Sequence, residues 1–364
     1  MNILIFSSYK DIWNSVRPEA EMFIEMANVG NNVTIVTQGE SEYVARFKAN
    51  GIKIIDCYPT KKVCCNTIKT LREELSTTHY DIVYAMNSKT IPNAAFACIG
   101  FKNTKMVTYR GTVGGLYKHD PSAYLTHLHP RVNGISCVAQ AVTDDVKKHV
   151  WMNANNVVTI YKGHDIVWYQ AKSISRAELN IPKDAIIVTC IANARPSKGV
   201  HVLLKSASQL SDLEELHILL IGRDMDTDAN LALANASGMK DRIHFLGYRK
   251  DVPEILATSD IQVQPSVSGE GLPKTIIEAM AMAVPSIVTT TGGGKELLID
   301  GESGYIVPVN NHTAIADKIR LLCAAKDRRK KMGLLAQQRM INEFSVQNTA
   351  QQHLDFFQTL LNNK

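Results

Sequence analysis

Short apolar segments alternate with longer amphipathic segments along almost the whole chain. In the first half, segments rich in Val, Ile and Leu indicate seven strands, at 2–6, 32–37, 52–56, 81–85, 105–109, 134–138 and 157–161. Six more follow in the second half, at 185–192, 217–222, 242–247, 260–265, 285–290 and 304–309. Strands that are apolar on both faces and are separated by helices predict parallel sheets covered on both sides.

The alternation is interrupted once, by the polar and charged segment 171–184, and then starts again. We therefore expect two doubly wound α/β domains, 1–168 and 169–344, each built on a Rossmann-like parallel sheet. The last amphipathic stretch, 345–364, has no strand to cover, so we expect it to cross back onto the first domain. Because open α/β sheets bind ligands at the carboxyl ends of their strands, the two domains are expected to face each other across a cleft.

Composition excludes several classes of protein. The 364 residues are 45% hydrophobic and 21% charged, which is ordinary for a folded protein and excludes a disordered or collagenous chain. No apolar run approaches the roughly 18–20 residues that cross a bilayer, and the first residues lack the pattern of a signal peptide. Seven cysteines without a repeated pair spacing indicate a reducing compartment, so we expect a cytoplasmic protein.

The net charge of +5 is concentrated in the first half, where residues 1–165 hold 18 Lys and Arg against 14 Asp and Glu. This excess favours contact with anionic lipid, hence the inner membrane surface, or with a phosphorylated acceptor; an ordinary solvated surface explains it equally well. Nucleic acid is not an expected partner, because the chain has no aromatic and basic recognition module. The basic run 326–331 is expected to be a solvated face.

The most informative stretch is 266–280, SVSGEGLPKTIIEAM, which follows a predicted strand and opens a helix with Pro273 at its first position. Glu270 and Glu278 suit two parts of one extended ligand if the first lies in the loop and the second in the helix. The N–H groups from Gly271 onward offer an anion site between them. A sugar, a phosphate and a ribose in series would match this order; an exposed Glu with a helix cap is the alternative.

Two further loops follow strands. In 193–199, NARPSKG, Arg195 and Lys198 can neutralise a diphosphate, Arg with a bidentate fork and Lys with a point charge. In 291–296, three glycines either permit close approach of the backbone to a ligand or form a plain turn. Asp224, Asp226 and Asp228 could be an acidic metal site, but their place at the start of a helix favours a dipole role. We therefore expect no metal.

Taken together, these residues resemble the retaining family-4 glycosyltransferases, which have the two-domain GT-B fold. RPSKG, PSVSGEGLPKTIIEAMAMAVP and TTTGGGKELLIDGESGYIVPVNN occur in the order and spacing of that family, and CVAQAVTDDV and IYKGHD resemble family stretches that close the first domain. The run 120–138 also resembles a subset of bacterial surface-polysaccharide transferases. The resemblance implies a nucleoside-diphosphate-sugar donor, a glycan or lipid-linked acceptor, and no cofactor or metal.

The resemblance also implies roles for individual residues. Arg195 and Lys198 would hold the donor diphosphate and stabilise it as a leaving group, with Glu270 and the Gly271–Leu272 backbone on the donor sugar. Glu278 would bind the ribose hydroxyls. The remaining donor-side candidates are Thr275, at the start of the same helix, and Tyr248 and Arg249, which would flank the base.

The first domain departs from the family pattern. The loop after the first strand, SSYKDIWNSVRPEAE, lacks the paired glycines that the family often has, and Arg17 is its candidate for the acceptor side. After the fifth strand, where many members have His, this chain has Tyr109-Arg110-Gly111-Thr112, so Arg110 and Gly111 are the other acceptor-side candidates.

The residues favour sugar transfer, and the resemblance implies that it occurs with retention of configuration, in surface polysaccharide or lipopolysaccharide synthesis. A nucleotide-sugar 2-epimerase on the same architecture and a non-catalytic nucleotide-sugar-binding subunit are the alternatives. The epimerase reading would need acid/base carboxylates and histidines facing the sugar. Donor base, sugar, acceptor and oligomeric state are not specified by these residues.

Overall fold

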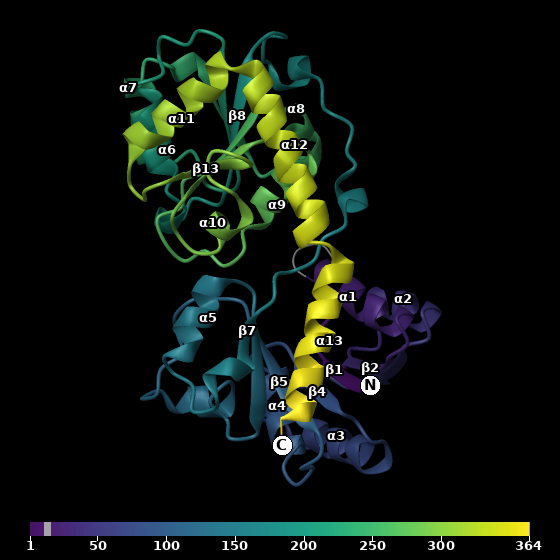
Figure 1. Cartoon of the computed structure of the whole chain (residues 1–364). Coiled ribbons are helices and arrows are strands. Elements are labelled where there is room, and N and C mark those ends of the chain that lie inside the picture. Colours follow the sequence, from purple (N-terminus) through teal and green to yellow (C-terminus); the bar gives the residue numbers. More distant parts are fainter. Residues whose placement is uncertain (11–15, 364) are drawn as a thin grey trace. The chain divides into compact units, whose positions relative to one another are not determined.

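The structure is a computed structural model that describes residues 1–10 and 16–363. The chain forms two compact units (Figure 1): Met1–Gly163 together with Phe344–Lys364, and His164–Glu343. The division falls a few residues before the boundary that the sequence pattern indicates.

The first unit contains one parallel sheet of seven strands in the order β3-β2-β1-β4-β5-β6-β7. The strands are β1 (Asn2–Phe6), β2 (Asn32–Thr37), β3 (Lys53–Asp56), β4 (Ile82–Ala85), β5 (Lys105–Arg110), β6 (Val132–Cys137) and β7 (Val157–Thr159). Chain order reverses between β1 and β4, the point at which doubly wound sheets bind ligands.

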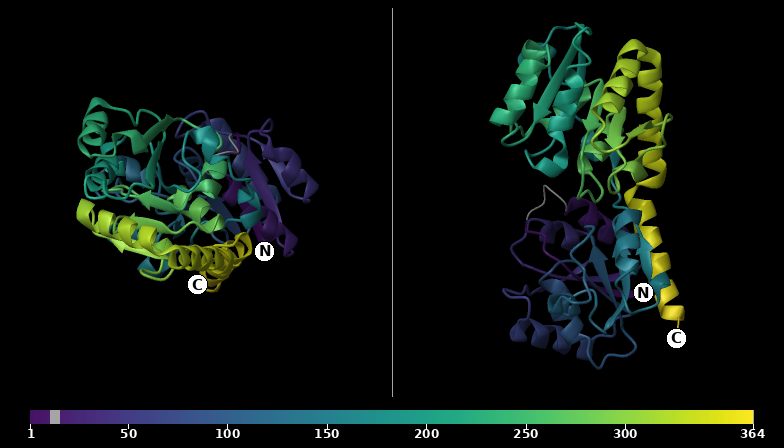
Figure 2. Two further views of the ribbon diagram at one scale, coloured as in Figure 1. Left: turned by 90° about the horizontal axis from the view of Figure 1, so that it is seen from above. Right: turned by 90° about the vertical axis from the view of Figure 1, so that its left-hand side faces the viewer.

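Helices of the first unit lie between these strands, and one returns from the end of the chain. They are α1 (Arg17–Asn28), α2 (Tyr43–Ala49), α3 (Cys65–Thr77), α4 (Thr90–Ala97), α5 (Gln140–Lys147) and α13 (Val346–Asn362), with short 3-10 turns η1 (Pro121–Leu125) and η2 (Ala154–Asn156). α13 packs against α1 (Figures 1 and 2), and its Phe357 is wholly buried beside Phe23 and Ile3. The amphipathic pattern of α13 is thus explained by burial in the first unit.

The second unit contains a parallel sheet of six strands in the order β10-β9-β8-β11-β12-β13. The strands are β8 (Ile186–Ile191), β9 (Leu216–Ile221), β10 (Ile243–Gly247), β11 (Ile261–Gln264), β12 (Ser286–Thr289) and β13 (Gly304–Val307). Successive residues of β8 enter different cores, Ile187 on one face and Val188 on the other. This two-sided burial is why the strand is apolar at every position except Thr189.

The helices of the second unit cover both faces of its sheet. They are α6 (Val200–Ala207), α7 (Asp228–Ala236), α8 (Val252–Thr258), α9 (Lys274–Ala281), α10 (Gly294–Leu297), α11 (His312–Ala324) and α12 (Lys326–Glu343), with 3-10 turns η3 (Ile166–Tyr169), η4 (Arg176–Leu179), η5 (Pro196–Lys198) and η6 (Lys240–Arg242). The predicted fold class, two doubly wound parallel-sheet domains, is confirmed.

The basic run 326–331 is not a solvated face throughout, so that prediction is wrong for one residue. Arg329 is only 7% exposed in the first turns of α12. Its guanidinium donates to the Leu322 carbonyl at 2.7 Å and pairs with Asp260 at 3.2 Å. A guanidinium can be buried there because a carboxylate and a carbonyl satisfy it.

Within the described residues, no helix is both long enough and apolar enough to span a bilayer. All seven cysteines are free thiols.

Candidate active site

The loops that follow β8 and β11 lie side by side, because these strands are neighbours at the point where chain order reverses in the second sheet. The Val267 N–H donates to the Ser197 carbonyl at 2.7 Å. Gly199 has φ +67°, and a Cβ at this position would lie 1.9 Å from the Pro265 carbonyl oxygen. Only glycine permits both the conformation and this contact.

Glu270 is the centre of a buried polar network formed by these two loops. Its side chain is 6% exposed, and its Oε1 accepts from Lys198 Nζ at 2.7 Å and Ser266 Oγ at 2.5 Å. A third, longer contact of 3.3 Å comes from Gln264 Nε2. Among the described residues Oε2 has no hydrogen-bond donor, so one oxygen fixes the carboxylate and the other is left for a ligand.

Gln264 and Ser266 were not among the residues that the sequence indicated. Gln264 is buried at the end of β11, and its Oε1 accepts from the Thr275 hydroxyl at 3.0 Å. Gln264 therefore joins the first turn of α9 to the Glu270 loop, and the Thr275 hydroxyl is directed to a protein partner. The signal in the sequence was the second of two glutamines in β11, IQVQ, at the last position of the strand.

Glu278 lies inside α9 and is 7% exposed, whereas Glu270 lies in the loop before the helix. Its carboxylate pairs with Lys274 at 2.9 Å, one turn earlier. α9 begins at Lys274 with Pro273 as its N-cap, so the expected place of Pro273 at the first helical position is wrong. Gly271 and Leu272 are half-buried in the loop before the helix.

Two cations project from the loop after β8, in different environments. Lys198 is half-buried and paired with Glu270, whereas Arg195 is exposed at the start of η5. Among the described residues the Arg195 guanidinium has no hydrogen-bonded or ionic partner. An anionic ligand would thus meet one open cation and one that is already held in place.

The three-glycine loop packs against the Glu270 loop. Gly292 has φ +56°, and a Cβ there would lie 2.1 Å from the Glu270 carbonyl oxygen. The Gly293 N–H donates to the Gly271 carbonyl at 2.8 Å. The close approach that Gly292 permits is therefore to the backbone of Glu270.

Tyr248 and Arg249 follow β10 and differ in how they are held. Tyr248 is 61% exposed, with the Arg223 guanidinium 4.9 Å from its ring centroid. Arg249 is paired with Asp251 through two hydrogen bonds, and these raise the pKa of Arg249. The ring of Tyr248 is thus exposed to solvent, whereas Asp251 holds the side chain of Arg249 within its own loop.

The acceptor-side candidates lie in the first unit. Arg110 ends β5 and donates to the carbonyls of Thr112 and Gly114, so it supports its own loop, and Gly111 is half-buried beside it. Burial lowers the pKa of Arg110, and Asp145 opposes that shift. Arg17 is the first residue of α1.

A buried polar cluster in the first unit was not predicted. Glu19 Oε1 accepts from Ser7 at 2.7 Å and from Tyr9 at 3.1 Å. Burial raises the pKa of Glu19, and Lys162 opposes that shift. Glu19 and Lys162 line a cavity of about 20 Å³ together with Tyr84, Tyr109 and His353. This volume suits a single water molecule.

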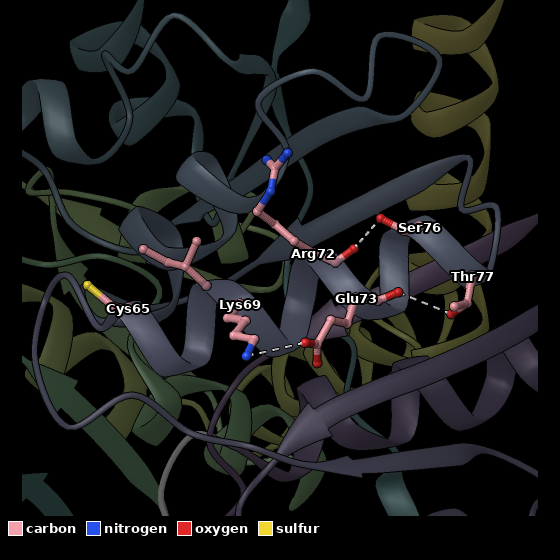
Figure 3. A pocket seen from close by; sticks show the side chains of 7 residues that line it. Cys65, Lys69, Arg72, Glu73, Ser76 and Thr77 are labelled. Atoms are coloured by element: carbon pink, nitrogen blue, oxygen red, sulfur yellow. Dashed lines mark hydrogen bonds and ion pairs between the residues drawn. The ribbon is translucent and has the colours of Figure 1, made fainter.

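Another hollow, of about 550 Å³, lies along α3 and is lined by side chains of that helix alone (Figure 3). Lys69 and Glu73 pair there at 3.9 Å. Arg72 donates to the carbonyls of Ala97 and Ile99 at the end of α4. Among the described residues, no second element contributes groups that converge on a ligand, so this hollow is not a candidate site.

Among residues 1–10 and 16–363, no group of three His, Cys, Asp or Glu side chains is arranged to hold a metal ion. Asp224 has φ +57° in the loop after β9, and Asp228 is the first residue of α7.

Two family models match successive parts of the chain. Residues 20–168 match Glycosyltransferase Family 4, and residues 171–339 match Glycosyl transferases group 1. N-acetyl-alpha-D-glucosaminyl L-malate synthase of Bacillus anthracis is 25% identical over 80% of this chain and 76% of its own length. The lipopolysaccharide core biosynthesis glycosyltransferase LpsE of Rhizobium meliloti is 26% identical over 58% of this chain and 60% of its own length.

Solved structures show the same fold over the whole chain. A glycosyltransferase from Rickettsia africae superposes with a TM-score of 0.79 at 20% identity, covering 100% of this chain and 99% of the other. HepE of Anabaena in complex with UDP superposes with a TM-score of 0.75 at 19% identity, covering 99% and 100%. Two glycosyltransferase models thus match the chain in succession, and the chain is a glycosyltransferase with the two-domain GT-B fold.

Proposed function

We propose that the protein transfers a sugar, with retention of configuration and without a metal ion, from a nucleoside-diphosphate sugar to a hydroxyl of a glycan or glycolipid. The observation that carries this proposal is the pair formed by half-buried Lys198 and buried Glu270 beside exposed Arg195, at the carboxyl ends of β8 and β11. The UDP and UDP-glucose held by HepE of Anabaena support a donor of this class. The name of LpsE supports a place in lipopolysaccharide or polysaccharide synthesis. A cytoplasmic location in peripheral contact with the membrane is part of the same proposal.

Different residues contact different parts of the donor. Arg195 and Lys198 neutralise the charge that develops on the diphosphate as the bond from sugar C1 to phosphate oxygen breaks. The open Oε2 of Glu270 accepts from sugar hydroxyls, and Glu278 accepts from the ribose hydroxyls. The acceptor hydroxyl attacks C1 from the face that the diphosphate leaves and gives its proton to the departing phosphate oxygen, so configuration is retained.

The donor site is tested by substitution. We expect Lys198→Ala and Glu278→Ala each to reduce sugar transfer by roughly a hundredfold or more, because each removes a group from a water-poor site. Donor class is first identified by thermal shift with UDP, GDP, ADP and their sugars, and transfer is then followed as release of the nucleoside diphosphate. Lys205→Ala, an exposed lysine of α6, and Glu302→Ala, an exposed glutamate, are matched controls.

The same assay separates the alternatives. Wild-type rates in both site variants would contradict the assignment. Conversion of the sugar nucleotide to an epimer without release of nucleoside diphosphate would indicate an epimerase, and binding without either reaction would indicate a non-catalytic subunit.

We expect transfer to be unchanged by EDTA, because two cationic side chains supply the charge that a metal ion supplies elsewhere. Transfer rates are compared before and after chelation, with dialysis into metal-free buffer as the control. Loss of transfer that Mn²⁺ restores would contradict this and would direct attention to Asp224, Asp226 and Asp228.

A further inference from the structure

The polar cluster around Glu19 lies at the place in the first sheet where a doubly wound fold holds its ligand. Ser7 and Tyr9 follow β1, and Tyr84 lies in the neighbouring strand β4. Chain order reverses between these two strands, and ligands of open α/β sheets bind at the carboxyl ends of strands beside such a reversal. The donor residues proposed above all belong to the second unit, so this cluster has no role yet.

One carboxylate oxygen of Glu19 is fixed, and the other is open. Oε1 accepts from Ser7 Oγ at 2.7 Å and from Tyr9 OH at 3.1 Å. Ser7 is 4% exposed and Tyr9 is wholly buried, so both donors are held in place. Among residues 1–10 and 16–363, no hydrogen-bond donor contacts Oε2, and the Glu19 side chain is only half-buried. This oxygen can therefore accept a hydrogen bond from a ligand.

Lys162 supplies a cation to the same cavity. It follows β7 and is half-buried, and its Nζ lies 5.2 Å from the centroid of the Tyr109 ring. Burial lowers the pKa of Lys162, but Tyr109 and Glu19 raise it further, so the side chain stays an ammonium. A Cβ at Gly111 would lie 3.1 Å from the Tyr109 hydroxyl oxygen, so the glycine leaves room for this ring.

The cavity of about 20 Å³ that these groups line is formed by α1, β4, β5, the segment after β7 and α13. Among the described residues of its lining, Glu19 and Lys162 carry the charges, because burial lowers the pKa of His353 to about 4 and keeps that ring neutral. The lining thus has one negative and one positive group. A space that holds one water molecule also holds one hydroxyl group.

The pairing of charges favours an uncharged ligand group. A hydroxyl donates its proton to a carboxylate and accepts from an ammonium, so it uses Glu19 and Lys162 together. A phosphate or carboxylate group would gain the attraction of Lys162 but would meet the repulsion of Glu19 at the same distance scale.

We propose that Glu19 and Lys162 bind one hydroxyl of the acceptor, and that the part of the acceptor entering the first unit is an uncharged sugar. Glu19 Oε2 accepts from this hydroxyl, and Lys162 Nζ donates to its oxygen. The proposal deepens the proposed function and rests on it for the identity of the ligand as acceptor. It also differs from the expectation for Arg110, whose guanidinium is bonded to carbonyls of its own loop.

The test measures binding of soluble sugars to the full chain by ligand-detected NMR, without a donor. The uncharged probes are methyl α-glucoside, methyl α-galactoside and methyl α-mannoside. We expect at least one of them to bind, and Glu19→Gln and Lys162→Met each to weaken its binding roughly tenfold or more. Glu19→Gln keeps an oxygen for Ser7 and Tyr9 and turns the open oxygen into a donor. Glucose 6-phosphate is expected to bind no more tightly than methyl α-glucoside.

Glu25→Gln in α1 and Lys48→Met in α2 are the matched controls, because neither residue lines the cavity. Both are expected to bind the glycosides like wild type. Circular dichroism melting verifies that each variant is folded, and Lys162→Met carries the test if Glu19→Gln does not fold. Titration with nucleoside diphosphates is expected to give wild-type affinity in every variant, because the donor residues lie in the second unit.

Four results would overturn the proposal: no binding of any glycoside to wild type, wild-type affinity in the Glu19 and Lys162 variants, equal loss in the controls, or tighter binding of glucose 6-phosphate than of methyl α-glucoside. Glycoside binding is measured without a donor, and sugar transfer is measured as release of nucleoside diphosphate. Failure of the proposed function and failure of this acceptor site are therefore distinguishable.

Discussion

At the residue scale, the site depends on how one carboxylate oxygen is held. Glu270 Oε1 is contacted by Lys198, Ser266 and Gln264. Ser266 is wholly buried, so water cannot easily replace its hydroxyl once that is removed. A hydrogen bond to a charged group contributes about 1.5–3 kcal/mol. We therefore expect Ser266→Ala to lower kcat by roughly ten- to a hundredfold, with a smaller change in KM for the donor.

Two further variants distinguish positioning from a general packing effect. Ser266→Thr keeps the hydroxyl and is expected to recover much of the rate. Ser206→Ala removes an equally buried hydroxyl, bonded to the Leu203 carbonyl in α6, and is expected to leave kcat unchanged. An unaltered kcat in Ser266→Ala would show that Lys198 and Gln264 suffice to position Glu270.

At the scale of elements, the site requires the loops after β8 and β11 to touch, and Gly199 is where they do. A Cβ at Gly199 would lie 1.9 Å from the Pro265 carbonyl oxygen, which belongs to rigid backbone. We expect Gly199→Ala to destabilise the second unit and to abolish donor binding, because separating the loops moves Lys198 from Glu270. Urea unfolding and donor titration measure the two effects.

The control for Gly199→Ala is Gly301→Ala. Gly301 also has a left-handed φ, +77°, but a Cβ there would meet no atom within 4 Å. This variant is expected to cost only the backbone preference, about 1–2 kcal/mol, and to bind donor normally. Equal losses of stability in the two variants would show that the loop contact at Gly199 is unimportant.

Elements also show what the sequence could and could not predict. Every predicted strand is present, because most strand residues are apolar, as in β8, and that pattern is local. Contacts between residues that are far apart in the sequence leave no such local pattern of apolar residues. Lys198 and Glu270 were assigned to different parts of the donor, yet they pair across 72 positions. Glu19 with its cluster, and Arg329 with Asp260, were missed for the same reason.

At the scale of the whole molecule, buried histidines make the first unit sensitive to acid. His353, in α13, is 4% exposed and has Nδ1 2.9 Å from the Thr349 carbonyl and Nε2 3.2 Å from the Tyr84 hydroxyl. The neutral ring satisfies both contacts, Nδ1–H donating and Nε2 accepting. Burial lowers the pKa of His353 to about 4, and burial together with Arg110 lowers the pKa of His127 to about 3.

The direction of the pH effect follows from these lowered values. Below pH about 6.5 the unfolded chain gains protons at both histidines, whereas the folded unit stays neutral there until pH about 4. The free energy of unfolding of the first unit therefore falls as the pH drops from about 6.5 towards 4, by up to about 1.4 kcal/mol per pH unit for each histidine. Above pH about 7 these groups add no pH dependence.

We expect His353→Gln to remove one histidine's share of this slope, because an amide at this position does not titrate. His312→Gln, in α11 of the second unit, is the matched control and is expected to keep the full slope. Urea unfolding between pH 5 and 8 gives the slope, and hydrogen exchange of peptides from α13 assigns it to the first unit. If wild type is as stable at pH 5 as at pH 7.5, or if His353→Gln keeps the full slope, then a buried neutral His353 is not what couples this unit to pH.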